Sequence, residues 1–151
     1  ILGLQKPSVW PVPKDNLQEL WSEMKMSKSV PNSAVFMTDT KKEIREKMKT
    51  AFCPQGEIDF NPLLDWAKYI VFINDNSKLE VKRPEKFGGN ITYNNYDDLA
   101  LDFAKEKLHP LDLKNAMSDK LIEILKPAME HFDNPKIKKM KEEMEELIVT
   151  R

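Results

Sequence analysis

The sequence predicts a mainly helical protein with one short β-hairpin. Apolar residues recur at helical spacing through most of the chain after residue 40, and strict alternation appears only near 79–83 and 91–93. Hydrophobic residues make up 40% and charged residues 32% of the 151 residues, which is typical of a globular protein and excludes a disordered one. A chain of this length accommodates one ordinary domain with a remnant of another.

The first two helices of the predicted bundle have clear start signals. Thr40 and Glu43 form a capping box, so a helix is expected over about 41–51, before Pro54 ends the pattern. Asn61 and Pro62 supply a cap and a first-turn proline for a strongly apolar helix, which ends at 74–76.

Beyond the predicted hairpin the pattern returns to helical spacing. One helix begins near Tyr96 and ends before His109-Pro110, because the residue before a proline avoids helical geometry. The next helix extends to Phe132, with a kink expected at Pro127. A last helix begins at Asn134-Pro135 and is expected to bury an apolar stripe made of Ile137, Met140, Met144 and Leu147.

The segment before residue 38 is irregular, because prolines interrupt it and only 17–23 has a helical pattern. Its apolar residues have little local periodicity. We therefore expect this segment to belong to a longer protein and to pack against polypeptide outside this chain through Leu2, Leu4, Val9, Trp10 and Trp21.

Overall charge does not indicate a nucleic-acid binder, since 24 basic and 25 acidic residues give a net charge of −1. Basic windows at 41–49 and 78–86 are able to contact phosphates, although composition alone favours a solvated face. Cys53 is the single cysteine, which excludes an internal disulfide and favours a reducing compartment, the cytoplasm. No metal site is expected, and no apolar run reaches the ~20 residues of a membrane span.

One short segment has the chemistry of a phosphate-binding loop. Two lysines three residues apart, with small residues between them, place two flexible ammonium groups where polyphosphate oxygens can be met. Exposed lysines without a specific role are the alternative from the residues alone. The segment, here called the lysine loop, is Lys25-Met26-Ser27-Lys28-Ser29.

This pentapeptide is identical to the KMSKS signature of class I aminoacyl-tRNA synthetases, and 30–36 resembles the continuation of that signature. Further segments at 44–54, 82–90 and 109–115 resemble the tyrosyl-tRNA synthetases of archaea and eukaryotes, in the same order. The last two segments favour the tyrosyl over the tryptophanyl branch. The resemblance covers about 25–132 and includes neither a HIGH signature nor a tyrosine pocket.

The resemblance implies two parts. Residues 1–37 would end an α/β nucleotide-binding catalytic domain that this chain otherwise lacks, and 38–151 would form a helical anticodon-binding domain. Lys25 and Lys28 would stabilise the charge on pyrophosphate as it leaves ATP, which binds with Mg²⁺ mainly in the absent domain, and the other loop residues would shape the loop. The implied partners are tyrosine, ATP, tRNA-Tyr and a second copy of the protein, joined through the catalytic domain.

The resemblance also implies residues that read the anticodon. Phe87 and His109 would sandwich its first base, a guanine, and Asp112 would hydrogen-bond the edge of that base, with Cys53 and Pro54 nearby. All but Pro54 have a simpler alternative from the residues alone: a core phenylalanine at a turn for Phe87, a helix cap for His109, an acidic first-turn residue for Asp112 and a small core cysteine for Cys53.

Two rival functions remain at this stage: a non-catalytic RNA-binding or regulatory paralogue, and a plain helical interaction module. The intact pair of loop lysines argues against both, because neither needs them.

Overall fold

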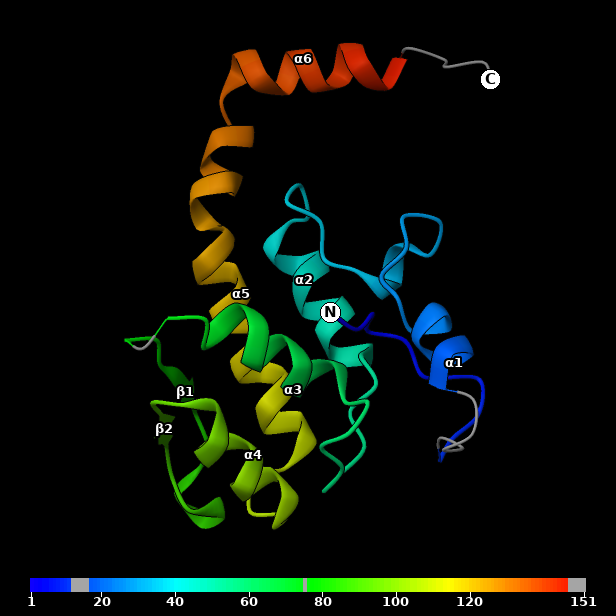
Figure 1. The fold of residues 1–151 in the computed structure, drawn as a ribbon. Coiled ribbons are helices and arrows are strands. Elements are labelled where there is room, and N and C mark those ends of the chain that lie inside the picture. The colour runs from blue at the N-terminus through cyan, green and yellow to red at the C-terminus, as the bar shows by residue number, and fades with distance from the viewer. Residues whose placement is uncertain (12–16, 75, 147–151) are drawn as a thin grey trace.

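The computed structural model describes residues 1–11, 17–74 and 76–146, and it is mainly helical with one antiparallel hairpin (Figure 1). The fold class predicted from the sequence is therefore confirmed. In chain order the elements are α1 (Leu17–Glu23), the 3₁₀ turn η1 (Pro31–Ser33), α2 (Lys41–Thr50), α3 (Pro62–Trp66), the π-helical turn η2 (Ala67–Val71), β1 (Leu79–Val81), the 3₁₀ turn η3 (Glu85–Phe87), β2 (Ile91–Tyr93), α4 (Tyr96–Ala104), α5 (Pro110–Phe132) and α6 (Pro135–Glu146).

The predicted helix starts are formed by side-chain caps. The Thr40 hydroxyl accepts a hydrogen bond from the Glu43 backbone N–H at 3.2 Å, and the Glu43 carboxylate accepts one from the Thr40 N–H at 2.7 Å. The Thr40 N–H and the Thr40 hydroxyl both donate to the Glu43 carboxylate, and they lower its pKa because they favour the charged form. Asn61 accepts from the backbone N–H groups of Leu63 and Leu64, which confirms the start of α3.

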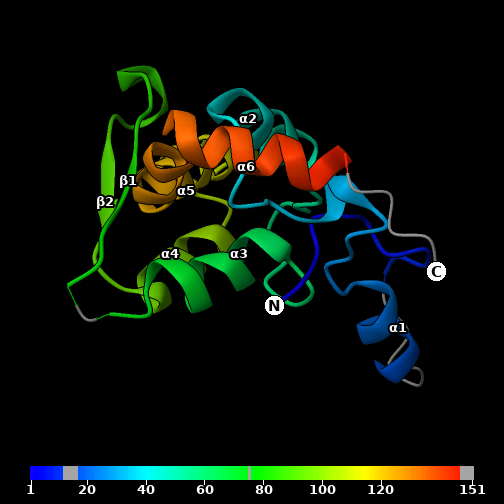
Figure 2. The same ribbon diagram turned by 90° about the horizontal axis from the view of Figure 1, so that it is seen from above.

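Helix α5 is the central element of the fold. Helix α2 packs along it, and strand β1 also packs against it (Figures 1 and 2). The contacting faces are fully buried and apolar, as the helical and alternating patterns require. They include Ile44 and Met48 from α2, Leu79 and Val81 from β1, and Leu113 and Met117 from α5.

Strands β1 and β2 pair as an antiparallel hairpin with a long connection. Leu79 pairs with Tyr93 and Val81 with Ile91, and Glu80, between the buried positions of β1, is exposed. Strand β1 ends at Val81, two residues before the predicted end. The nine residues 82–90 then loop out and return with η3 at their centre.

The N-terminal segment packs more closely on the helices than the sequence predicts. Leu2 and Leu4 are buried within this chain, so the expectation that they pack outside it is wrong. The Leu2 carbonyl accepts a hydrogen bond from the Trp66 indole N–H at 2.6 Å, and the Leu4 carbonyl accepts one from the Phe52 N–H at 2.8 Å. Long-range backbone pairing of this kind leaves no periodic signal in the sequence.

The other apolar residues of this segment differ. Val9 and Trp21 are 53% and 52% exposed, while Trp10 is partly buried with its ring 4.9 Å from that of Phe52. Their packing against other polypeptide stays a prediction.

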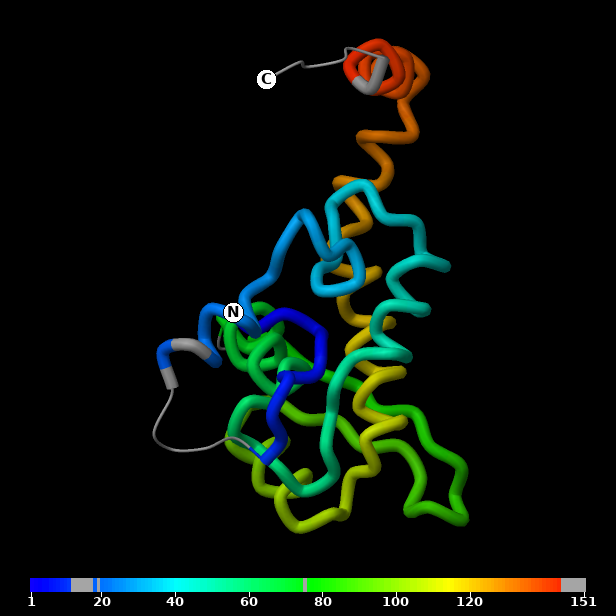
Figure 3. Tube along the Cα trace, turned by 90° about the vertical axis from the view of Figure 1, so that its right-hand side faces the viewer, coloured from blue at the N-terminus to red at the C-terminus, as the bar shows by residue number. Residues whose placement is uncertain are grey.

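Helix α6 turns away from the end of α5 and projects from the rest of the molecule (Figures 1 and 3). Its expected burial is wrong for Met140 and Met144, which are 50% and 71% exposed, and Leu147 lies outside the described residues. Ile137 is partly buried, and the stripe lines a hollow together with Thr38 and Phe132. Helix α5 itself continues through Pro127 to Phe132.

Candidate nucleic-acid interface and lysine loop

The lysine loop is fixed to the N-terminal segment. Lys25 forms an antiparallel backbone bridge with Leu2, and the Gly3 N–H donates to the Met24 carbonyl. The two strands approach so closely that a side chain at Gly3 would place its Cβ 3.1 Å from the Met24 oxygen. A larger residue at this position would force these backbone neighbours to move by a few tenths of an ångström.

Ser33 holds the backbone of the lysine loop in place. Its side chain is fully buried, and its hydroxyl accepts from the Ser27 N–H at 2.9 Å and donates to the Ser27 carbonyl at 3.2 Å. The Ser29 N–H donates to the Ser27 hydroxyl at 3.2 Å. The backbone between the two lysines is thus held by hydrogen bonds, and Met26 packs against the main core.

The side chains of Lys25 and Lys28 are exposed, and neither forms an ion pair with any residue that the structure describes. Two unpaired ammonium groups on a braced backbone have the chemistry needed to meet a polyphosphate. Within residues 1–11, 17–74 and 76–146, no cluster of three or more histidine, cysteine or acidic side chains is arranged to hold a metal ion.

A second candidate site lies on the other side of the molecule, beside the hairpin (Figures 1 and 2). Phe87 ends the turn η3 and is 61% exposed, so it is not the core phenylalanine of the simpler interpretation. Gly88 follows it with φ of +96°, a left-handed conformation that favours glycine. The ring is therefore presented to solvent by a turn that is closed by its own backbone hydrogen bonds.

His109 and Asp112 lie at the start of α5. His109 is the N-cap residue, and its Nδ1 accepts a hydrogen bond from the Leu111 N–H at 3.1 Å. Asp112 lies in the first turn, where the helix dipole favours a carboxylate. The cap and dipole roles predicted for these two residues are thus present, and both side chains also face a common hollow.

This hollow, here called the base pocket, has a volume of about 440 Å³ and is lined by Arg83, Phe87, Glu106, Lys107, His109, Leu111 and Asp112. It lies between the β1–β2 connection and the segment from the α4–α5 connection into the first turn of α5. The sequence identified Phe87, His109 and Asp112, and the structure brings all three together. Sequence reasoning missed the other four, because no periodicity or motif indicates that two separate connections meet.

Cys53 and Pro54 do not line the base pocket. Burial raises the pKa of the Cys53 thiol to about 11, and the Asn61 amide donates to its sulfur at 3.6 Å. The turn that contains them still reaches the pocket rim, because the Gln55 amide donates to Glu106 at 3.2 Å. Their anticodon role stays a prediction, and the packing of Cys53 is that of a small core residue.

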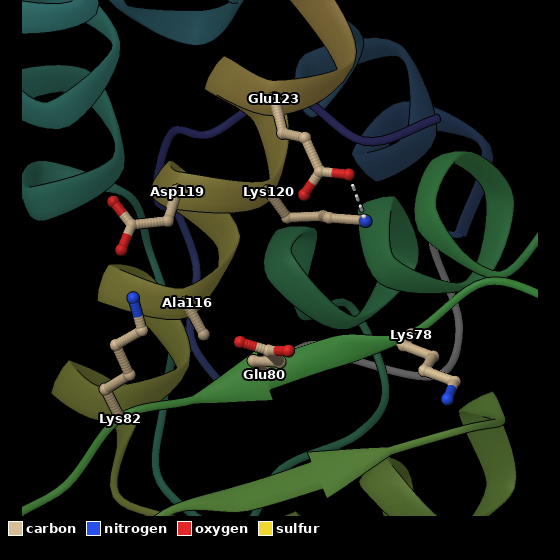
Figure 4. A pocket seen from close by; sticks show the side chains of 7 residues that line it. All are labelled: Lys78, Glu80, Lys82, Ala116, Asp119, Lys120 and Glu123. Carbon is tan, nitrogen blue, oxygen red and sulfur yellow. Dashed lines mark hydrogen bonds and ion pairs between the residues drawn. The ribbon is translucent and has the colours of Figure 1, made fainter.

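Another hollow, of about 260 Å³, lies between β1 and α5 (Figure 4). Its charged lining residues balance, with Lys78, Lys82 and Lys120 against Glu80, Asp119 and Glu123. Lys120 pairs with Glu123 at 2.9 Å, and Asp119 pairs with Arg45 at 2.7 Å. Because its charges are compensated internally, this hollow is a weaker candidate for binding phosphate than the lysine loop.

Comparisons with known proteins identify the family of this chain. A family model described as tRNA synthetases class I (W and Y) matches residues 3–126. The tyrosine-tRNA ligase of Thermococcus kodakarensis is 49% identical over 152 residues, which span 100% of this chain and 40% of the relative. The corresponding ligase of Thermococcus gammatolerans is 52% identical over 134 residues, 88% of this chain and 36% of its own length.

Among solved structures, the tyrosyl-tRNA synthetase of Pyrococcus horikoshii in complex with L-tyrosine matches with a TM-score of 0.82 at 49% identity. That match covers 87% of this chain and 36% of the solved one. The chain thus spans less than half the length of each of these relatives. No helix in the described part of the chain is both long and apolar enough to cross a membrane.

Proposed function

The chain belongs to the class I tRNA synthetases of the tryptophan and tyrosine group, and on this premise we propose that it is part of a tyrosine-tRNA ligase. In that enzyme, tyrosine is activated with ATP to tyrosyl-adenylate and transferred to tRNA-Tyr. The relatives named above are tyrosine-tRNA ligases, which supports the tyrosyl over the tryptophanyl assignment.

One observation carries the anticodon-binding part of this proposal: Phe87, His109 and Asp112, from two separate connections, line the same pocket. A splayed RNA base needs flat faces for stacking, and the two aromatic rings supply them. A carboxylate accepts two hydrogen bonds from guanine, through N1–H and N2–H. The pocket therefore has the groups to bind a guanine at the first anticodon position.

The lysine loop supplies the second part. The tyrosine carboxylate attacks the α-phosphate of ATP, and pyrophosphate leaves with increasing negative charge. Lys25 and Lys28 are exposed and unpaired among the described residues, so their ammonium groups are available to stabilise that charge. The Mg²⁺ that accompanies ATP would be held mainly in the part of the catalytic domain that lies outside this chain.

The proposed organisation follows from these two sites. Residues 1–37 form the end of a catalytic domain with the lysine loop, and 38–151 form the anticodon-binding domain. The enzyme acts in the cytoplasm as a homodimer joined through its catalytic domain, with tRNA-Tyr, tyrosine and ATP as its partners. The unpaired lysines favour a catalytic protein over a non-catalytic paralogue.

The test uses the complete synthetase that contains this chain, with tRNA-Tyr transcripts carrying guanine or adenine at the first anticodon position. Asp112→Ala should lower kcat/KM with the guanine transcript by a factor equivalent to ~1–3 kcal/mol, as expected for a bidentate base contact. The loss should be smaller with adenine, which lacks the N1–H and N2 donors. Asp119→Ala is the matched control, since Asp119 lies on the same helix and pairs with Arg45.

The preference for guanine decides the outcome. If Asp112→Ala prefers guanine as strongly as the parent, Asp112 is only a first-turn helix residue and the base-reading assignment is wrong. Amino-acid activation with tyrosine and with tryptophan separates the two branches of the family.

A further inference from the structure

The two walls of the base pocket are on independent segments. Phe87 lies on the connection between β1 and β2, and His109 lies on the connection between α4 and α5. Stacking a base between two rings requires that their separation stay close to the thickness of one base. Some contact must therefore hold the two connections in place.

Arg83 makes that contact. Its Nε donates to the Gly89 carbonyl at 3.0 Å, and its Nη1 donates to the Lys107 carbonyl at 3.0 Å. Gly89 lies two residues after Phe87, and Lys107 lies two residues before His109. Among the described residues, no other hydrogen bond or ion pair joins 82–90 to 104–112.

The chemistry of this contact requires arginine. A guanidinium presents donors in a rigid planar fork, so one side chain bridges two carbonyls at a fixed spacing. A lysine has the same charge, but its single nitrogen sits on a flexible stem. The packing is also close, because a Cβ at Gly88 would lie 3.1 Å from Arg83 Nη2.

The base of the Phe87 loop is also fixed at Arg83. The Arg83 backbone N–H donates to the Asn90 side-chain oxygen at 3.0 Å, which closes the connection between its two ends. One residue thus closes the loop that presents Phe87 and ties that loop to the segment preceding His109.

We infer that Arg83 is a positioning residue of the base pocket: its guanidinium sets the spacing between Phe87 and His109, and it acts on the base through those rings. The inference rests on the proposed anticodon-binding function. It predicts a defect in tRNA binding without a defect in amino-acid activation.

The first measurement is steady-state charging of tRNA-Tyr by the complete synthetase and by Arg83→Met and Arg83→Lys. Both variants should raise KM for tRNA roughly 10-fold, the size of a lost base stack, with kcat and ATP–pyrophosphate exchange unchanged. Arg83→Lys keeps the charge, so its failure to restore KM would separate the fork geometry from simple attraction to phosphate. Lys82→Met is the matched control, because it removes a positive charge from the adjacent position.

The second measurement is a double-mutant cycle with Phe87→Ala. If Arg83 acts through the Phe87 ring, Arg83→Met combined with Phe87→Ala should raise KM no further than Phe87→Ala alone. Unchanged pyrophosphate exchange in each variant would show that the folded enzyme is intact.

Several results would overturn the inference. If Arg83→Lys has the parent KM for tRNA, Arg83 contacts the RNA by charge. The same follows if the increases in KM of Arg83→Met and Phe87→Ala multiply in the double variant. A rise in KM for Phe87→Ala but not for Arg83→Met would remove the positioning role and leave the proposed function standing. No rise for Phe87→Ala would remove the base-binding function and the inference with it.

Discussion

Asp39 and Lys47 form a nearly buried ion pair, with 2.6 Å between the carboxylate and ammonium groups and side-chain exposures of 10% and 11%. Asp39 also accepts a hydrogen bond from the Phe36 N–H at 2.8 Å, and the Lys47 ammonium lies 4.5 Å from the centre of the Phe36 ring. The pair therefore fastens the segment that follows the lysine loop onto α2.

Lys47→Met should lower the free energy of unfolding by about 3–5 kcal/mol, because it leaves the Asp39 carboxylate buried without its partner. The Arg45–Asp119 pair is the matched comparison, since its side chains are 56% and 50% exposed. Arg45→Met should cost about 1 kcal/mol or less. Denaturant unfolding measures both, and equal losses would show that the Asp39–Lys47 pair is effectively solvated.

Replacing Lys25 or Lys28 by alanine in the complete synthetase should slow tyrosine-dependent ATP–pyrophosphate exchange by roughly 10²-fold or more, because in the proposed mechanism each lysine stabilises charge on the leaving group. Lys42→Ala serves as the control, since Lys42 is exposed on α2 and pairs only with Glu46 among the described residues. An unchanged exchange rate in the loop variants would exclude their catalytic role.

Ser33→Ala tests whether the hydrogen bonds between Ser33 and Ser27 position the lysine loop for catalysis. The change removes two hydrogen bonds to the Ser27 backbone and leaves the partly buried Ser27 N–H without its acceptor. Exchange should slow by roughly 10-fold, because misplaced charges stabilise the transition state less well. Preference for guanine at the anticodon should not change, and a shift in that preference would contradict a local role.

Lys86→Ala should weaken charging of every tRNA about equally and reduce the slope of its salt dependence by about 1, if Lys86 contacts phosphate. The Lys86 ammonium lies 4.9 Å from the centre of the Phe87 ring. A loss confined to guanine-bearing tRNA would instead place Lys86 in base recognition.

Cys53 should resist alkylation. Its pKa is raised from 9.0 to about 11 by burial, so the reactive thiolate is roughly 100-fold less populated near pH 8 than in an unshifted thiol. The associated stability is fully present below pH 9 and is lost as pH rises from 9 to about 11, because only the unfolded chain ionises readily there. Iodoacetamide labelling followed by mass spectrometry, with and without urea, measures the protection. Equal rates in both conditions would contradict it.

Local signals predicted most of the fold. The Thr40–Glu43 box and the Asn61 cap are short-range chemistry, so the starts of α2 and α3 were predicted correctly. The π-helical turn η2 was not predicted, because its residues have the same apolar pattern as an ordinary helix. Burial of Leu2 and Leu4 also escaped prediction, since it depends on hydrogen bonds to Trp66 and Phe52, more than 40 residues away.

The candidate site was predictable only where a resemblance identified it. Phe87, His109 and Asp112 are unremarkable as residue types, and their convergence depends on the hairpin folding back beside the start of α5. No local sequence pattern identifies Arg83, because its inferred role depends on hydrogen bonds to the carbonyl groups of residues 89 and 107. Tertiary contacts of this kind are a property of the assembled backbone.

The cap at the start of α5 also determines where the proton of one imidazole lies. His109 Nδ1 accepts from the Leu111 N–H, so the neutral ring carries its hydrogen on Nε2. That tautomer leaves Nε2–H as a donor directed away from the helix. The cap and the tautomer are therefore two consequences of one hydrogen bond.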